Sequence, residues 1–333
     1  MNRREFLNRS GAASACVLGL AALPKESFAA DQITVASPQG FLAEYSYLFN
    51  AYSGGHFKRQ GLDAKVIGVN GIQAIQQLVS GQVQFIGTTA ISLISAVAKN
   101  NAPLVSIGTV GQRSKFFIVS LESDPIRSIA DLKDKIVGTT AAGSATSVNL
   151  EAVLVKAGMK MSDIQTQVVG ASPNVVEFIK QKRISCFVTA IDNVMRLQKM
   201  GEPIVALSLA DYIKMPGDIL VTTRDVISGK PDLVMRFMRA MGDSVKEVID
   251  GDLIAILKRE SGDFEMVGLE DIKAAAEMQE ESMRKLWLSE GRQNLLKNVP
   301  ELWAAGADAL RSLGYKNIAA PETYYTNAFV PAV

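Results

Sequence analysis

The chain has 333 residues, 48% hydrophobic and 21% charged, which is enough apolar material for two cores of ordinary domain size. Its formal net charge is +1, and it contains no low-complexity tract or short-period repeat. This balance excludes a polybasic surface for nucleic acid or membranes, and it excludes a disordered or solenoid chain. We therefore expect a compact globular protein that binds no nucleic acid.

Residues 1–29 are predicted to be a signal peptide. They begin with a basic stretch, continue with an apolar run at 11–23 that is too short to span a bilayer, and end in small residues before Ala30. The adjacent Arg3 and Arg4 are typical of a twin-arginine signal, although ordinary secretory signals also contain such pairs. Without this segment the chain keeps 31 basic and 32 acidic residues. We therefore expect an almost neutral, soluble protein in the periplasm.

After the signal, strand and helix patterns alternate, which predicts a mostly parallel sheet covered by helices. Amphipathic helices are expected between the strands, and one of them ends at Gly81. The strands expected in this first unit are 33–35, 64–69, 83–86, 103–107 and 115–120.

A second α/β unit is predicted to begin near residue 121. A capping-box pattern that starts at Ser128 predicts a short helix. The strands expected in this unit are 135–140, 167–169 and 185–189. The segment 218–225 has the pattern of a strand that crosses back to the first unit, and the chain from Pro231 onward is predicted to be almost entirely helical.

Two segments echo each other, one in each unit. Residues 78–92 have the pattern of a helix end, a glycine turn, a short apolar strand and a cluster of small polar residues, and residues 179–193 follow the same plan. In open α/β sheets ligands bind beyond the carboxyl ends of strands, so these strand ends indicate two facing half-sites. The side chains expected at these half-sites are Thr88, Thr89, Thr189 and Asp192.

The turn at 143–147 predicts a third contact surface. It follows a strand and opens a helix, whose unpaired N–H groups favour an anionic group beside the hydroxyls of Ser144 and Thr146. The competing interpretation is that these hydroxyls only cap their helix. Asp192 has two alternatives as well, because it either caps the helix 193–200 or faces an amine of the ligand.

The sequence lacks the residues and motifs that common catalytic sites require. His56 is the single histidine, which excludes histidine-based zinc sites, and no P-loop, Gly-x-Ser-x-Gly elbow or Gly-x-Gly-x-x-Gly fingerprint occurs. His56 follows two glycines, so we expect it on a surface turn. Cys186 is the one cysteine after residue 29 and lies in an apolar run, so we expect a buried thiol and no intramolecular disulfide. We expect no catalytic residue, no metal and no cofactor.

Segments 71–89, 128–159 and 219–240 resemble the substrate-binding proteins of bacterial ABC importers, in particular the subgroup for sulfonates, taurine, nitrate and thiamine-type pyrimidines. The resemblance implies a two-lobed α/β periplasmic binding protein of the type II fold, with two hinge crossovers and C-terminal helices packed on the first lobe. The lobes that it implies are 30–118 with 219–333, and 119–218. The hinge is implied near 116–120 and 216–221.

The resemblance also implies a function. Such a protein acts as a monomer that captures a small solute between its lobes and delivers it to the membrane permease of an ABC importer. The turn at 143–147 and the loop Gln39, Gly40 and Phe41 match ligand-contacting segments of the family, and Phe41 either stacks on a planar ligand or packs in the core. Gln84 and Ser185 stand where the family commonly has an acid.

The chemistry of the expected site favours an anionic ligand. Small hydroxyls beside a helix start suit a sulfonate, taurine, a carboxylate or nitrate. Three alternatives remain open: a receptor for a thiamine-pyrimidine precursor, a periplasmic sensor subunit, and an enzyme like the pyrimidine synthases, which share this fold.

Overall fold

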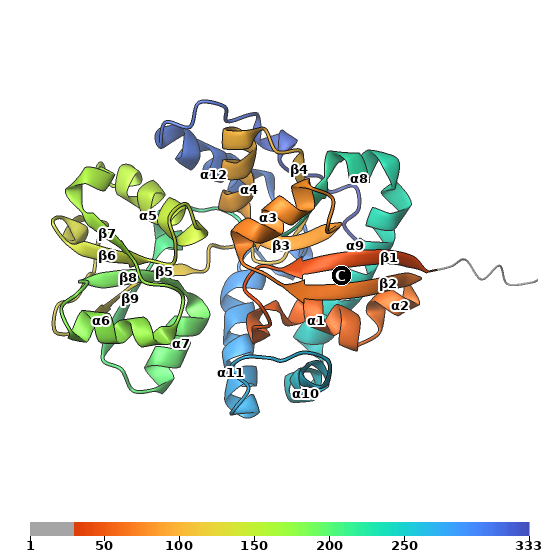
Figure 1. Cartoon of the computed structure of the whole chain (residues 1–333), viewed down its shortest axis with the longest axis horizontal. Helices are drawn as coiled ribbons and strands as arrows, with labels where there is room; N and C mark the ends of the chain where they lie inside the picture. Colours follow the sequence, from red (N-terminus) through yellow and green to blue (C-terminus); the bar gives the residue numbers. More distant parts are fainter. Residues whose placement is uncertain (1–29, 333) are drawn as a thin grey trace, which may run out of the picture.

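Two five-stranded sheets form the framework of the computed structural model, which describes residues 30–332. The sheets lie in two lobes, side by side, and the chain crosses between them twice (Figure 1). Lobe 1 has the strand order β2-β1-β3-β10-β4, and lobe 2 has the order β7-β6-β8-β5-β9. The strands of lobe 1 are β1 (Asp31–Ser37), β2 (Leu62–Gly68), β3 (Phe85–Thr89), β4 (Leu104–Thr109) and β10 (Asp218–Thr223). Those of lobe 2 are β5 (Phe116–Leu121), β6 (Ile136–Thr139), β7 (Gln165–Val168), β8 (Cys186–Ala190) and β9 (Ile204–Ser208). The predicted two-lobed α/β fold is confirmed.

The two sheets follow the same plan. In each, four strands run in the same direction, and the fifth runs antiparallel to both of its neighbours. That antiparallel strand is β10 in lobe 1 and β5 in lobe 2, so each is the first strand after a crossing. The prediction that 115–120 continues the first sheet was therefore wrong, because the backbone of β5 pairs with β8 and β9.

The two crossings run beside each other at residues 110–115 and 209–217; the first lies just before the implied segment 116–120, and the second overlaps the start of 216–221. The amide of Gly217 donates to the carbonyl of Gly111 at 2.7 Å, and the amide of Gly111 donates to the carbonyl of Asp218 at 2.9 Å. A Cβ atom at position 217 would collide with the carbonyl oxygen of Arg113. Glycine at this position therefore permits the close approach of the crossings.

Helices cover both faces of the lobe 1 sheet. One face packs against α3 and α4, and the other packs against α1 and α9. The helices of the first half of the chain are α1 (Ser46–Ser53), α2 (His56–Arg59), α3 (Gly71–Val79), α4 (Ala90–Asn100), α5 (Ala145–Lys156), α6 (Val176–Lys180) and α7 (Ile191–Lys199). Those that follow β10 are α8 (Arg224–Gly229), α9 (Pro231–Asp250), α10 (Leu253–Asp263), α11 (Ile272–Ser282) and α12 (Pro300–Ser312). Within residues 30–332, none of these helices has the length and apolar character needed to cross a bilayer.

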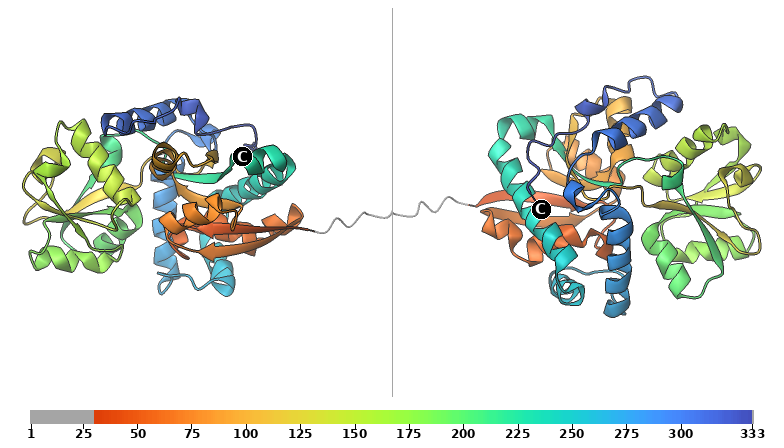
Figure 2. Two further views of the ribbon diagram at one scale, coloured as in Figure 1. Left: turned by 45° about the horizontal axis from the view of Figure 1, so that its top comes forward. Right: turned by 180° about the vertical axis from the view of Figure 1, so that it is seen from behind.

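The C-terminal helices pack on lobe 1, as predicted, and two of them also reach lobe 2. Helix α12 contacts α4 of lobe 1 and α5 of lobe 2, and α11 contacts α7 of lobe 2. Figure 2 shows α11 and α12 on opposite sides of the junction between the lobes. On the α12 side one apolar core, which includes Ile94, Val148 and Trp303, is continuous across the two lobes. The lobes are thus joined by packed helices as well as by the crossings.

An aromatic stack attaches α9 to the lobe 1 sheet and offers a test of this packing. The Phe237 ring lies between Phe57 and Phe85, with centroid distances of 5.8 and 3.8 Å. Phe237→Ala should lower the free energy of unfolding by about 3–5 kcal/mol, because it leaves a cavity in the core. Denaturant titration measures this loss. The control Met235→Ala, on the same helix but 37% exposed, should change the free energy by about 0.5 kcal/mol or less; equal losses in the two variants would contradict the packing.

Candidate functional site

A cleft of about 1170 Å³ lies between the lobes, where the carboxyl ends of strands from both sheets meet. Polar side chains from both lobes line it, mostly hydroxyls and amides, and its charged side chains are Lys99, Asp192 and Arg196. Eight of the nine predicted site residues line this cleft: Gln39, Gly40, Thr88, Thr89, Ser144, Thr146, Thr189 and Asp192.

Phe41 is the ninth, and it does not line the cleft. Its ring stacks on Phe264 at a centroid distance of 5.2 Å and meets Phe49 edge-on at 5.6 Å. Of the two interpretations of Phe41, the structure shows core packing. The loop that carries it places Gln39 and Gly40 at the cleft instead.

The lobe 2 wall contains an open helix start. Ser144 precedes α5, yet its side chain makes no capping hydrogen bond. Its hydroxyl instead donates to the carbonyl of Ala141 at 2.7 Å and lies 2.8 Å from the Thr146 hydroxyl, which accepts from the amide of Thr140 at 3.0 Å. Within residues 30–332, the N–H groups at 145–147 have no hydrogen-bond acceptor. These N–H groups and the dipole of α5 favour an acceptor group of a ligand.

Helix α7 also starts at the cleft without a side-chain cap. Asp192 lies in its first turn, and Ala190 occupies the position before the helix, so the interpretation of Asp192 as the cap was wrong. The side-chain Nδ2 of Asn193 donates to the Thr189 hydroxyl and to the carbonyl of Ala171, both at 2.8 Å. These bonds fix the end of β8 against the preceding loop.

Two helices of lobe 1 that start at the cleft, α3 and α4, are capped by their own side chains. Asn70 Oδ1 accepts from the amide of Gln73 at 2.9 Å and caps α3, and the Thr89 hydroxyl accepts from the amide of Ser92 and caps α4. The two walls therefore differ at these helix starts, because Asn70 and Thr89 satisfy N–H groups of α3 and α4, whereas the N–H groups at the start of α5 have no acceptor within the described residues.

The echoed segments occupy equivalent places in the two sheets. Gln84 precedes β3, and its side-chain oxygen accepts from the amide of Thr34 in β1 at 2.8 Å. Ser185 precedes β8, and its hydroxyl accepts from the amide of Ile136 in β6 at 3.3 Å. Each of these side chains accepts a hydrogen bond from a backbone N–H of the neighbouring strand. Both are uncharged, and both lie at the end of their strand that is remote from the cleft.

Below the cleft, a buried lysine joins the first crossing to lobe 1. Lys115 Nζ lies 3.1 Å from both Glu44 Oε1 and Asp218 Oδ1, and it donates to the Tyr45 hydroxyl at 2.8 Å. Burial alone would lower the pKa of Lys115, but the Asp218 and Glu44 carboxylates raise it above its ordinary value. The lysine is therefore charged, and it compensates two buried carboxylates.

Asp192 is a third carboxylate near this lysine. Burial and the negative charge of Glu44 raise the pKa of Asp192 to about 7, against the opposing effect of Lys115. Asp192 thus changes charge close to neutral pH. A ligand group that contacts it meets a donor when Asp192 is protonated and an acceptor when it is ionised.

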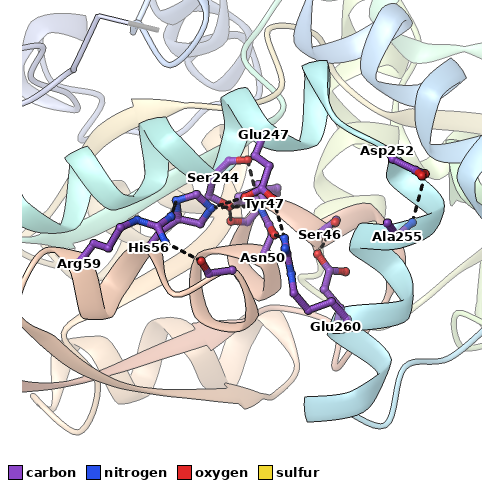
Figure 3. A network of polar contacts seen from close by, with 12 residues as sticks. Ser46, Tyr47, Asn50, His56, Arg59, Ser244, Glu247, Asp252, Ala255 and Glu260 are labelled. Atoms are coloured by element: carbon purple, nitrogen blue, oxygen red, sulfur yellow. Dashed lines mark hydrogen bonds and ion pairs between the residues drawn. The ribbon is translucent and has the colours of Figure 1, made fainter.

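The single histidine lies away from the cleft, in the polar network of Figure 3. His56 starts α2, is buried, and its Nε2 lies 2.6 Å from Glu247 Oε2 on α9. The expectation of a surface turn was wrong, because Glu247 and Arg59 provide partners for both ring nitrogens. Cys186 is buried as predicted, and burial raises its pKa to about 12. Across residues 30–332 no group of three or more histidine, cysteine or acidic side chains could hold a metal ion.

The structure adds residues that the sequence did not single out. Asn70 lies just beyond the end of β2, and Thr89 is the last residue of β3. The position of Asn70 near a strand end could therefore have identified it as a cleft residue. Arg196 lies one helical turn after Asp192 on α7, but the neighbouring sequence does not identify it as a cleft residue. Tyr45 and Phe116 line the cleft although they are almost fully buried.

Two α/β lobes of the same plan, joined by two crossings around a polar cleft, define the fold of the periplasmic binding proteins. The family model described as NMT1/THI5 like matches residues 43–251, and the chain belongs to this family. The chain is 23% identical over 261 residues to the riboflavin-binding protein RibY of Chloroflexus aurantiacus, an alignment that covers 75% of this chain and 71% of RibY.

Solved structures support the fold. The alkanesulfonate-binding protein SsuA from Xanthomonas axonopodis pv. citri, bound to MOPS, superposes with a TM-score of 0.68 at 16% identity, covering 89% of this chain and 98% of SsuA. The periplasmic nitrate-binding protein NrtA from Synechocystis PCC 6803 gives a TM-score of 0.64 at 13% identity, covering 90% of this chain and 86% of NrtA. The predicted fold of a type II periplasmic binding protein is confirmed.

Removal of the buried cation should destabilise the protein. Lys115→Met leaves the Glu44 and Asp218 carboxylates buried together without compensation, so it should cost about 3–5 kcal/mol of unfolding free energy. The control Lys135→Met breaks an exposed ion pair with Asp124 and should cost about 1 kcal/mol or less. Denaturant titration of both variants measures the two costs. A loss for Lys115→Met no larger than that of the control would contradict the role of Lys115.

The raised pKa of Asp192 predicts a pH dependence of stability. Between its ordinary value of 3.8 and about 7 the folded chain keeps a proton that the unfolded chain has lost, so the contribution of Asp192 to stability falls as the pH rises. Asp192→Asn removes this term, so the variant should gain stability relative to the wild type between about pH 5 and about pH 8. Denaturant titration at the two pH values measures this gain. The exposed control Asp263→Asn should show no such gain, and parallel curves for Asp192→Asn would refute the prediction.

Proposed function

We propose that this protein is the solute receptor of an ABC importer, and that it captures a small organic ligand between its lobes and delivers it to the membrane permease. The observation that carries this proposal is the cleft itself, which takes polar groups from the strand ends of both lobes. A ligand that contacts both lobes makes some contacts only when they approach, so it favours the closed form. The permease would recognise that form.

The cleft favours a ligand whose head group presents hydrogen-bond acceptors to lobe 2. The free N–H groups at the start of α5 and the Ser144 hydroxyl suit a sulfonate, a carboxylate or the carbonyl edge of a pyrimidine-type ring. Ligand sites commonly measure about 300–1,000 Å³, so the cleft of about 1170 Å³ has room for a small organic solute. The similarity to RibY supports a planar ring as the second candidate head group.

The signal peptide, the periplasmic location and the monomeric state form part of this proposal. Residues 1–29, on which the prediction of export rests, lie outside the described residues. Secretion assays and light scattering of the purified protein would test the location and the monomeric state.

A thermal-shift screen tests the receptor function. Taurine, longer alkanesulfonates, nitrate, aromatic carboxylates, aminopyrimidines and riboflavin form the panel. A true ligand at about 100 times its dissociation constant should stabilise the folded protein by about 2.7 kcal/mol, because it binds only the folded state. If no compound of any class raises the melting temperature, the assignment of the head group fails.

Titration calorimetry with the best compound of the panel tests the α5 contact. Ser144→Ala removes a hydroxyl that lines the cleft and should weaken binding by about two- to tenfold. Ser147→Ala removes a hydroxyl from the same helix that does not line the cleft, so it should leave the affinity unchanged. Equal affinities in the two variants would refute the contact.

A further inference from the structure

A second cavity, of about 260 Å³, adjoins the cleft on the α11 side. We call it the side cavity; it lies between α7 of lobe 2, α11 of lobe 1 and the turn that carries Glu44. It shares four lining residues with the cleft: Leu42, Asp192, Arg196 and Val267. A ligand in the cleft could therefore extend into the side cavity past Asp192 and Arg196.

A buried amide in the side cavity lacks a partner. Gln279, on α11, is 3% exposed, and its Nε2 has no hydrogen-bond partner within residues 30–332. A buried donor without an acceptor costs stability, and an acceptor group on a molecule in the side cavity would remove this cost. Ser282, which is also buried, offers a hydroxyl to the same cavity.

Acceptors lie opposite these donors. The Glu44 carboxylate, 7% exposed, and the Asp192 carboxylate both line the side cavity. The exposed carboxylates of Glu270 and Asp271 stand at its rim and disfavour an anionic occupant.

Arg196 separates the two compartments and remains available to a ligand. Within the described chain no carboxylate lies close enough to Arg196 to form an ion pair. Its guanidinium lies against Gly268, where a Cβ atom would collide with it. The Arg196 side chain thus reaches from lobe 2 to a loop of lobe 1, between the cleft and the side cavity.

We propose that the side cavity is a second subsite, which binds an uncharged, hydroxylated chain of an elongated ligand whose head group occupies the cleft. This proposal rests on the proposed function of the cleft. A hydroxyl group both accepts and donates, so a polyol chain can accept from Gln279 and donate to Glu44 and Asp192. Its carbon atoms would pack on the apolar groups of Met195, Ala275 and Met278.

Methionine methyl NMR distinguishes the two compartments. Of the methionines in the described part of the chain, three line the side cavity, Met195, Met200 and Met278, and none lines the cleft. Ribitol, a neutral polyol, should shift the methyl signals of Met195 and Met278 saturably at roughly millimolar concentration. The fully buried Met238 and Met241 of lobe 1 serve as internal controls and should not respond.

Two variants and two charged probes complete the test. Gln279→Leu should weaken ribitol binding by about two- to tenfold, whereas Gln198→Leu, exposed on α7 outside both cavities, should not. Ala275→Leu, which fills the side cavity, should abolish the response. The anionic polyol gluconate and the cationic polyol glucamine should bind more weakly than ribitol. If no polyol shifts Met195 and Met278, or if a charged polyol binds more tightly, the proposal is wrong.

The outcomes separate this proposal from the proposed function. Panel compounds that raise the melting temperature while ribitol leaves both methyl signals unmoved would support the cleft and refute the side cavity. Ribitol shifts without any stabilising panel compound would support the side cavity and refute the head-group assignment.

Discussion

The buried contact of Lys115 with Glu44 and Asp218 is the constraint on which the arrangement of the lobes depends. Lys115 ends the first crossing, Asp218 starts the strand that follows the second, and Glu44 lies in the turn before α1. One positive charge thereby ties both crossings to the same point of lobe 1. Charges buried at this depth tolerate little displacement, because separation would leave a carboxylate without compensation. The contact therefore holds the two crossings together at the base of the cleft.

The same contact sets the electrostatics of the cleft. Burial and the negative charge of Glu44 raise the pKa of the neighbouring Asp192 on lobe 2, and the positive charge of Lys115 opposes this rise. The protonation of Asp192, in the first turn of α7, thus depends on the charges of Glu44 and Lys115. Polar recognition in the cleft combines this titrating carboxylate, the guanidinium of Arg196 and the N–H groups of α5 that have no acceptor within residues 30–332.

Local patterns were enough to predict the alternating elements, the paired strand ends and six of the eight predicted residues that line the cleft, whereas Gln39 and Gly40 came from the family resemblance. They could not predict which sheet a buried strand joins, because a run such as Phe116–Leu121 has the same pattern in either. Contacts between distant segments were also missed. His56 meets Glu247 191 residues further along the chain, and Phe41 meets Phe264. Gln279 shares a cavity with α7 only because the lobes pack together there.

The position of β10 has a consequence for the order of folding. All five strands of lobe 2 lie within residues 116–208, so that sheet can form as soon as this segment has been synthesised. The lobe 1 sheet cannot be completed until residues 218–223 have been synthesised, because β10 lies between β3 and β4. Until β10 arrives, β3 and β4 have unpaired edges, which are the surfaces on which chains aggregate. The N-terminal lobe is thus completed last, and a chaperone would be needed longest by the half of the protein that leaves the ribosome first.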